Sequence, residues 1–334
     1  MNRRLFKIAM LGVCCCLGLL GAFLLGRYPV SPMEVMGIAF GRLFAVEPFW
    51  TERMEIIFWN VRLPRIALSM LVGMSLSAAG ASYQGVFQNP MASPDILGAS
   101  SGAGFGAALA IMMGLSGFGI AGLAFLSGMI CVLVVMLCAS KARGQSAMGL
   151  LLSGIMIGSL FSAATSFLKL IADPNDQLPA ITYWLMGSLS GSKLSEVQMV
   201  IVPLGIGLIG LLLLSWKLNY LTLGDDEARA LGTNPMALRM GIVILSTLLT
   251  AASVAVSGAI GWVGLVVPHM MRKWVGGEYR YLMPASMLGG GLFLLIVDTV
   301  SRTIWTSEVP LGILTAFVGV PFFLYLILGR EDDA

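Results

Sequence analysis

The sequence predicts an all-α polytopic membrane protein with about ten transmembrane helices. Hydrophobic residues make up 57% of the 334 positions, and the mean hydropathy is +0.90. Charged residues make up only 11%, whereas soluble domains carry about 25%. The apolar residues are concentrated in runs such as Ile201 to Leu214. This composition excludes a disordered chain, a basic nucleic-acid-binding domain and a disulfide-stapled secreted fold.

The apolar runs can be matched to membrane crossings, because a span needs about 20 mainly apolar residues in a helix. Two apolar segments, 96–113 and 259–271, are shorter and are interrupted by Gly or Pro. With eight longer segments they make ten crossings, which return the C-terminus to the side of the N-terminus. The full-length spans are expected at 5–26, 63–87, 118–139, 148–171, 199–218, 239–257, 282–301 and 310–328.

The distribution of lysine and arginine predicts the orientation. With the N-terminus inside, twelve of the 20 basic residues lie on the cytoplasmic side of the predicted spans. Basic residues are enriched in cytoplasmic loops. We therefore expect a multi-pass protein of the cell (inner) membrane, with both termini in the cytoplasm.

The two interrupted segments suggest an internal repeat within a single transmembrane domain, 1–334. Residues 63–171 and 239–328 would each hold four spans, and the first block would start outside while the second starts inside. Corresponding broken helices in two oppositely oriented halves are typical of an inverted repeat around a transport path. The sequence similarity between the two blocks is weak.

The first interruption has a clear sequence signature. Asn89-Pro90 precedes Ser93-Pro94-Asp95. Proline lacks the backbone donor that would continue the first helix, and Ser93 or Asp95 can cap the next one. We therefore predict a break in the helical path at these five residues.

The chemistry-bearing residues do not form a catalytic or metal-binding set. The only histidine, His269, lies beside Pro268 without a second histidine, cysteine or paired carboxylate nearby. The five cysteines lie in apolar runs without CxxC spacing, and we interpret them as small buried hydrophobes. We expect no enzymatic activity, no bound cofactor or metal, and no nucleic-acid partner.

Few ionisable side chains lie within the predicted spans. Lys169, Asp298 and Arg302 each lie within about one turn of the outer boundary, so no mid-membrane carboxylate is available to bind Na⁺ or relay protons. This placement disfavours an ion-coupled secondary transporter. That class remains an alternative because broken helices and inverted repeats are also found there.

A short polar stretch, 219–236, lies between two predicted spans on the cytoplasmic side. We predict a short helix with its three acidic residues, Asp225 to Glu227, near the N-terminal end, and with Gly232 and Asn234-Pro235 ending it. Such a helix is either an ordinary solvated loop helix or a docking site for a cytoplasmic motor.

Four motifs in this order resemble a known family. They are Arg62-Leu-Pro-Arg65, the segment 89–98 (NPMASPDILG), the segment 223–232 (LGDDEARALG) and the segment 257–269 (SGAIGWVGLVVPH). Together they resemble the permeases of ABC importers for ferric siderophores, haem and vitamin B12. The resemblance runs from about residue 50 to the C-terminus.

The resemblance implies partners and sites. The permeases of this family form dimers around the path, here expected as a homodimer, and ATP is hydrolysed by separate cytoplasmic subunits. A substrate-binding protein would dock on the outer side at Arg62, Arg65 and Arg302. The inner gate would match Ser146-Ala147-Met148, which is less polar than in the vitamin B12 permease. The loop that contacts the ATPase would comprise Leu223, Gly224, Asp225, Asp226, Glu227, Ala228, Arg229, Leu231 and Gly232.

The resemblance also implies the cargo. The segment 93–104 (SPDILGASSGAG) is most similar to the members that carry iron complexes. We therefore expect an iron-siderophore complex, with vitamin B12 and haem as alternatives. An apolar, non-specific lining would suit a large chelate that passes through without being held.

Overall fold

The computed structural model describes residues 3–26, 28–44, 47–141, 147–305 and 307–328. Within these ranges every regular element is helical. The helices are α1 (Arg3–Leu24), α2 (Pro32–Phe44), α3 (Glu52–Ile57), the π-helical turn η1 (Phe58–Arg62), α4 (Leu63–Val86), the 3₁₀ turn η2 (Pro94–Leu97), α5 (Ala99–Met112), α6 (Phe118–Lys141), α7 (Ala147–Ile171), α8 (Gln177–Leu185), α9 (Leu194–Leu223), α10 (Asp225–Ala230), α11 (Pro235–Ser257), α12 (Val263–Val275), α13 (Tyr279–Thr303) and α14 (Leu311–Leu328).

The all-α polytopic prediction is confirmed. Each of the ten predicted crossings corresponds to a helix, and seven helices of the described ranges are long and apolar enough to span a membrane. The second of these runs without interruption from Glu52 to Val86, so it begins eleven residues before the predicted start at residue 63. The helices α5, α12 and α14 are shorter. Connections between the predicted spans also form helices that the hydropathy pattern did not predict, namely α2, α3 and α8.

The centre of the bundle is α4, which packs against α9, α11, α12 and α13. Most of its residues are buried, including Ser69, Ser75 and Ser77. Glycines allow the closest approaches, because a Cβ at Gly73 or at Gly80 would overlap a backbone carbonyl oxygen of the neighbouring helix. Close packing through small residues is the usual way in which helices associate in a bilayer.

The contacts between helices follow the two predicted halves. Helix α4 packs on α12 and α13, and the corresponding α11 packs on α5 and α6. The outermost helices correspond in the same way, since α7 packs on α5 and α6, while α14 packs on α12 and α13. The first helix of each half therefore packs on the second and third helices of the other half, as an inverted repeat of 63–171 and 239–328 would produce. The repeat itself stays a prediction.

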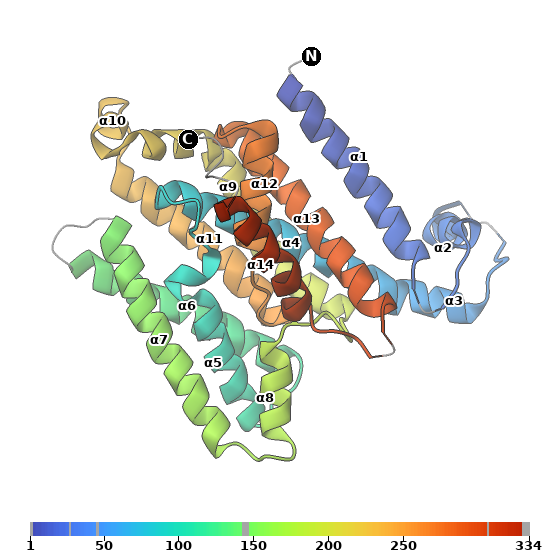
Figure 1. The fold of residues 1–334 in the computed structure, drawn as a ribbon. Helices are drawn as coiled ribbons and strands as arrows, with labels where there is room; N and C mark the ends of the chain where they lie inside the picture. The colour runs from blue at the N-terminus through green and yellow to red at the C-terminus, as the bar shows by residue number, and fades with distance from the viewer. Residues whose placement is uncertain (1–2, 27, 45–46, 142–146, 306, 329–334) are drawn as a thin grey trace.

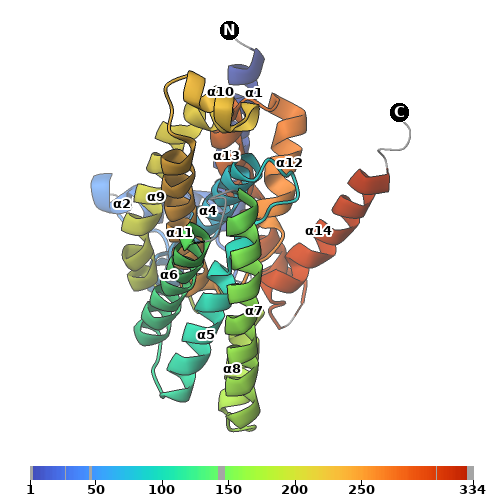
Figure 2. The same cartoon turned by 90° about the vertical axis from the view of Figure 1, so that its left-hand side faces the viewer.

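The two ends of the bundle differ in what they carry. Helix α10 and the beginning of α1 lie at one end, and α8 lies at the other (Figures 1 and 2). Helix α1 runs along one edge beside α13, and α2 and α3 lie at its far end (Figure 1). With the predicted orientation, α10 is therefore on the cytoplasmic side, and α2, α3 and α8 are on the outer side.

Candidate functional site

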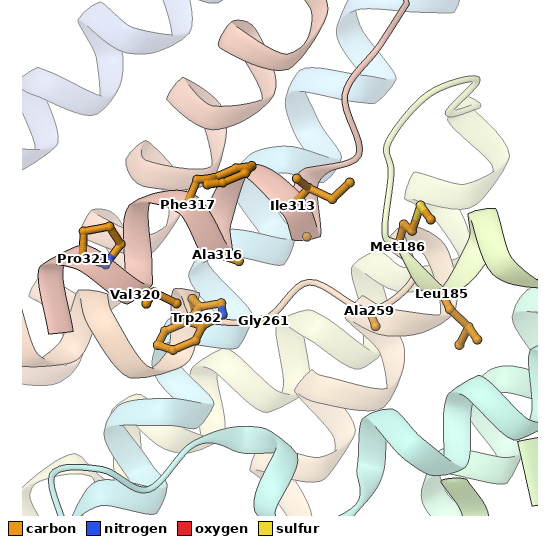
Figure 3. Close-up of a pocket in the computed structure, with 11 residues that line it drawn as sticks. Leu185, Met186, Ala259, Gly261, Trp262, Ile313, Ala316, Phe317, Val320 and Pro321 are labelled. Carbon is orange, nitrogen blue, oxygen red and sulfur yellow. The ribbon is translucent and has the colours of Figure 1, made fainter. Parts of the chain in front are cut away.

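One cavity of the structure is apolar and has a volume of about 660 Å³. Its walls come from the end of α8, from the connection between α11 and α12, and from α14 (Figure 3). None of its lining residues is charged, so it can hold an apolar or large ligand but offers nothing to bind a small ion tightly. The lining residues are Leu185, Met186, Ala259, Gly261, Trp262, Gly312, Ile313, Ala316, Phe317, Val320 and Pro321.

Two helix interruptions meet beside this cavity. The first separates α4 from α5, and the second, 258–262, separates α11 from α12. Trp262 in the second interruption has φ +70°, a conformation that non-glycine residues rarely adopt and that often marks a functional position. The first interruption contacts the start of α12, just after the second interruption, since a Cβ at Gly264 would lie 2.6 Å from Pro94 Cδ.

The first interruption lies at the predicted residues, but its capping differs from the prediction. Helix α4 ends at Val86, Pro94 begins η2, and the Asn89 side chain accepts a hydrogen bond from the Met91 N–H at 2.9 Å. Ser93 makes no side-chain cap, and the Asp95 carboxylate accepts the Ser100 hydroxyl instead of a backbone N–H. Gly98 immediately precedes α5 and has φ +76°, a left-handed backbone conformation that glycine adopts without strain.

Helices α7 and α14 are among the helices that present long apolar faces to the outside of the subunit. Helices α7 and α14 leave most of their large side chains uncovered, with Leu170 80% and Phe317 74% exposed. Exposed apolar area of this extent requires lipid or a second protein surface. The exposed side chains are Met148, Leu152, Ile155, Met156, Leu160, Phe167, Leu170 and Ile171 on α7, and Ile313, Phe317, Val318, Val320, Leu324 and Tyr325 on α14.

The three arginines expected on the docking surface are buried, which corrects the expectation that they are exposed. Arg62, Arg65 and Arg302 are each less than 9% exposed and line one cavity of about 230 Å³. Arg62 donates to the carbonyl oxygens of Phe23 and Tyr28. Arg62 is buried because the helix begins at Glu52. Arg62 therefore lies in η1, within a packed helix, and not in an exposed first turn.

The other two arginines form an ion-pair network with two carboxylates. The Arg65 Nε lies 2.9 Å from Asp298, and its Nη1 donates to both oxygens of Glu308 at 2.8 and 2.9 Å. Arg302 donates to the Ala22 carbonyl at 2.7 Å and lies 3.8 Å from Asp298. We call Arg65, Arg302, Asp298 and Glu308 the outer charge cluster. It connects α4, α13, the end of α1 and the segment that leads into α14.

The polar stretch 219–236 forms the predicted short helix, α10, between left-handed glycines at 224 and 232. Ala228 faces the bundle, and Asp226, Glu227 and Arg229 point outward, with Leu223 60% and Leu231 53% exposed beside them. A surface helix flanked by two exposed leucines is suited to a protein partner. Asp225 differs from its acidic neighbours because it pairs with the buried Arg239 of α11 at 2.8 Å.

Three further predictions concern the inner gate, metal binding and the cysteines. Ser146 of the expected inner gate lies outside the described residues, while Ala147 begins α7 and the Met148 side chain is exposed. In the part of the chain that the structure describes, no cluster of three or more His, Cys, Asp and Glu side chains could hold a metal ion. Three cysteines are exposed, contrary to expectation: Cys14, Cys16 and Cys138.

A polar network at the end of the bundle that carries α10 was not predicted from the sequence. The Arg272 guanidinium donates to the Gln84 amide oxygen at 3.2 Å and to the Tyr279 hydroxyl at 3.1 Å. The Tyr279 N–H donates to the Asn219 side chain at 2.9 Å. Gln84 is 3% exposed within an apolar helix, and a polar side chain in such a helix is the signal that could have indicated the network.

Comparison with known proteins agrees with this geometry. A model of the FecCD transport family matches residues 11–329. A Haemophilus influenzae molybdate import permease, MolB, is 40% identical and covers 91% of this chain and 89% of its own. A Helicobacter pylori permease assigned to iron chelatin transport is 40% identical, covering 82% of this chain and 83% of its own. A Halobacterium salinarum cobalamin permease, BtuC, is 41% identical, covering 85% of this chain and 76% of its own.

A solved structure has the same architecture. It is an inward-facing conformation of a transporter assigned to the metal-chelate type of ABC transporters, with a TM-score of 0.87 and 36% sequence identity. The match covers 97% of this chain and 99% of the other. The whole bundle therefore has the overall arrangement of that protein.

Proposed function

We propose a cargo and a working cycle for this chain, starting from the fact that it belongs to the FecCD transport family. The chain is a multi-pass permease of an ABC importer, which is a transporter component and not an enzyme. This membership replaces the alternative of an ion-coupled secondary transporter.

The proposed cargo is a ferric chelate, such as an iron-siderophore complex. The observation that carries the proposal is the apolar cavity beside the helix interruptions, because its lining has no charged residue. A small oxyanion such as molybdate would need cationic or N–H donors in its path to replace water. A large chelate buries its metal within an organic shell and needs only shape and apolar surface. Haem and vitamin B12 satisfy the same requirement and remain the alternatives.

In the proposed cycle the chain works as a dimer of two copies. The exposed apolar faces of α7 and α14 would meet their counterparts and enclose the path. Helix α10 would rest on a cytoplasmic ATPase, whose ATP-driven closure would switch the path between outward and inward access. No residue of this chain would hydrolyse ATP, and no cofactor or metal would be bound by it.

On the outer side, a substrate-binding protein would deliver the cargo. Because Arg62, Arg65 and Arg302 are buried, we propose that they support the docking surface from below. They would fix the outer ends of α1, α4 and α13, as well as the segment before α14, against which the partner would dock.

Uptake by the reconstituted importer tests the cargo. Proteoliposomes that hold the permease and its ATPase would receive the cognate binding protein with ⁵⁵Fe-siderophore, haem, cobalamin or molybdate. We expect ATP-dependent accumulation of the ferric siderophore and no accumulation of molybdate. Accumulation of molybdate, or of cobalamin or haem alone, would contradict the proposed cargo.

A further inference from the structure

The inner end of the bundle contains a chain of contacts that begins at α10. Helix α9 ends at Leu223, directly before α10, and Leu221 on its last turn is fully buried. The Leu221 carbonyl oxygen accepts a hydrogen bond from the Gln88 side-chain amide. Gln88 lies just beyond the end of α4, so this bond connects the base of α10 with the first helix interruption.

The backbone of Gln88 is unusual. Its φ of +48° places it in the left-handed region, where glycine is the ordinary choice. A non-glycine residue in that region costs roughly 1 kcal/mol or more and persists where its surroundings hold it. A glycine here would remove the strain but also the amide. The hydrogen bond to Leu221 therefore requires a side chain that glycine lacks.

The connection from Gln88 to η2 is short and internally bonded. The Gln88 N–H donates to the Gly85 carbonyl, and the Asn89 N–H donates to the Gln84 carbonyl at 3.2 Å. The Ala92 N–H donates to the Asn89 carbonyl at 3.0 Å, and Ala92 is fully buried. These bonds tie Gln88 and Asn89 to the end of α4, and the turn from Asn89 to Ala92 leads directly to Pro94.

The far end of the route is packed directly on α7. A Cβ at Gly154 of α7 would overlap the Ile96 carbonyl oxygen, and a Cβ at Gly158 would lie 3.3 Å from the Gly98 Cα. Backbone therefore meets backbone, and no flexible side chain lies between to absorb a shift. Helix α7 also has a long exposed apolar face.

We propose that Gln88 is a positioning residue that transmits movements of α10 through η2 to α7. The inference rests on the proposed function, because it needs an ATPase at α10 and a path along α7. It adds a specific route to that function: α10, the end of α9, Gln88, η2 and α7. Coupling between distant sites requires such a contiguous network of packed and bonded elements.

Paired measurements of ATP hydrolysis and uptake test the route in the reconstituted importer. Gln88→Leu removes the donor, while Gln88→Lys keeps a donor of similar reach. Gln177→Leu is the matched control, because Gln177 also donates its amide to a backbone carbonyl, that of Met112, but at the outer end. For Gln88→Leu we expect near-normal hydrolysis with about tenfold less cargo moved per ATP. Gln88→Lys and Gln177→Leu should retain the wild-type ratio.

A second variant keeps the test decisive if Gln88→Leu folds poorly. Gly154→Ala perturbs the other end of the same route and should also lower cargo moved per ATP. The double variant should then lose less than the product of the two single effects, because both act on one route. Multiplicative effects, equal losses of hydrolysis and uptake, or an unchanged ratio in Gln88→Leu would each overturn the inference. The ratio is measured with whichever labelled cargo the wild-type complex accumulates. An error in the proposed cargo is therefore distinguishable from a failure of the proposed route.

Discussion

At the residue scale, the outer charge cluster decides how the outer ends of the helices are held. Arg65 and Asp298 are both buried and pair directly, while Glu308 is the second partner of Arg65 and Arg302 lies 3.8 Å from Asp298. Breaking a buried ion pair by removing one partner is far more destabilising than losing an exposed pair. The cluster therefore stabilises the fold and holds the segment before α14 in place.

We predict that Asp298→Asn destabilises the purified protein by about 3–5 kcal/mol, because Arg65 and Arg302 lose their shared carboxylate. Thermal unfolding in detergent measures the loss. Glu52→Gln, at an exposed carboxylate on α3, is the control and should change stability by less than about 0.5 kcal/mol. Equal stability of Asp298→Asn and the wild type would show that the cluster carries no such energy.

The burial of these arginines could not be predicted from the sequence. Hydropathy places the start of the span at Leu63, which makes Arg62 and Arg65 boundary residues. Their surroundings depend instead on the continuous helix from Glu52 and on Glu308, which is far away in the sequence and folds back onto Arg65. The Asn89–Asp95 break was predictable, because proline and its neighbours act locally.

At the element scale, glycine contacts set the spacing of the central helices. We predict that Gly73→Ala destabilises the protein by about 1–3 kcal/mol, because the added methyl group overlaps the Gly290 carbonyl oxygen. Gly12→Ala in α1 is the matched control. It has open space at this position and should be neutral or slightly stabilising. Thermal unfolding compares the two, and similar melting temperatures would argue against this packing.

Helix α10 is the element that we expect to contact the ATPase. We predict that Leu223→Ser combined with Leu231→Ser reduces co-purification of the ATPase at least tenfold, because both leucines are exposed beside the helix and would lose apolar contact area. Thr222→Ala, a neighbouring exposed position, should retain the ATPase. An intact complex with the double variant would place the ATPase contact elsewhere.

The short helix itself was predictable, because its acidic N-terminal residues and its glycines are local signals. Its contact with Arg239 was not, since that pairing depends on how α11 packs. Asn234 also proved to cap α11, accepting bonds from the N–H groups of Met236 and Ala237, and does not end α10.

At the scale of the whole molecule, the unpaired faces of α7 and α14 bear on the proposed dimer. We predict that Phe317→Ser shifts the purified protein toward monomers, because it removes a large exposed side chain from the α14 face. Light scattering after size exclusion measures the mass. Leu133→Ser, at an exposed position of α6, is the control and should leave the mass unchanged. A monomeric wild type, or an unaffected dimer, would argue against this interface.

The central claim is that ATP hydrolysis by a separate subunit drives transport through this chain. The most direct measurement is cargo accumulation in proteoliposomes with the permease and binding protein, in the presence or absence of the ATPase and ATP. We expect accumulation only when ATPase and ATP are both present. Accumulation driven by an imposed proton or sodium gradient without the ATPase would contradict it.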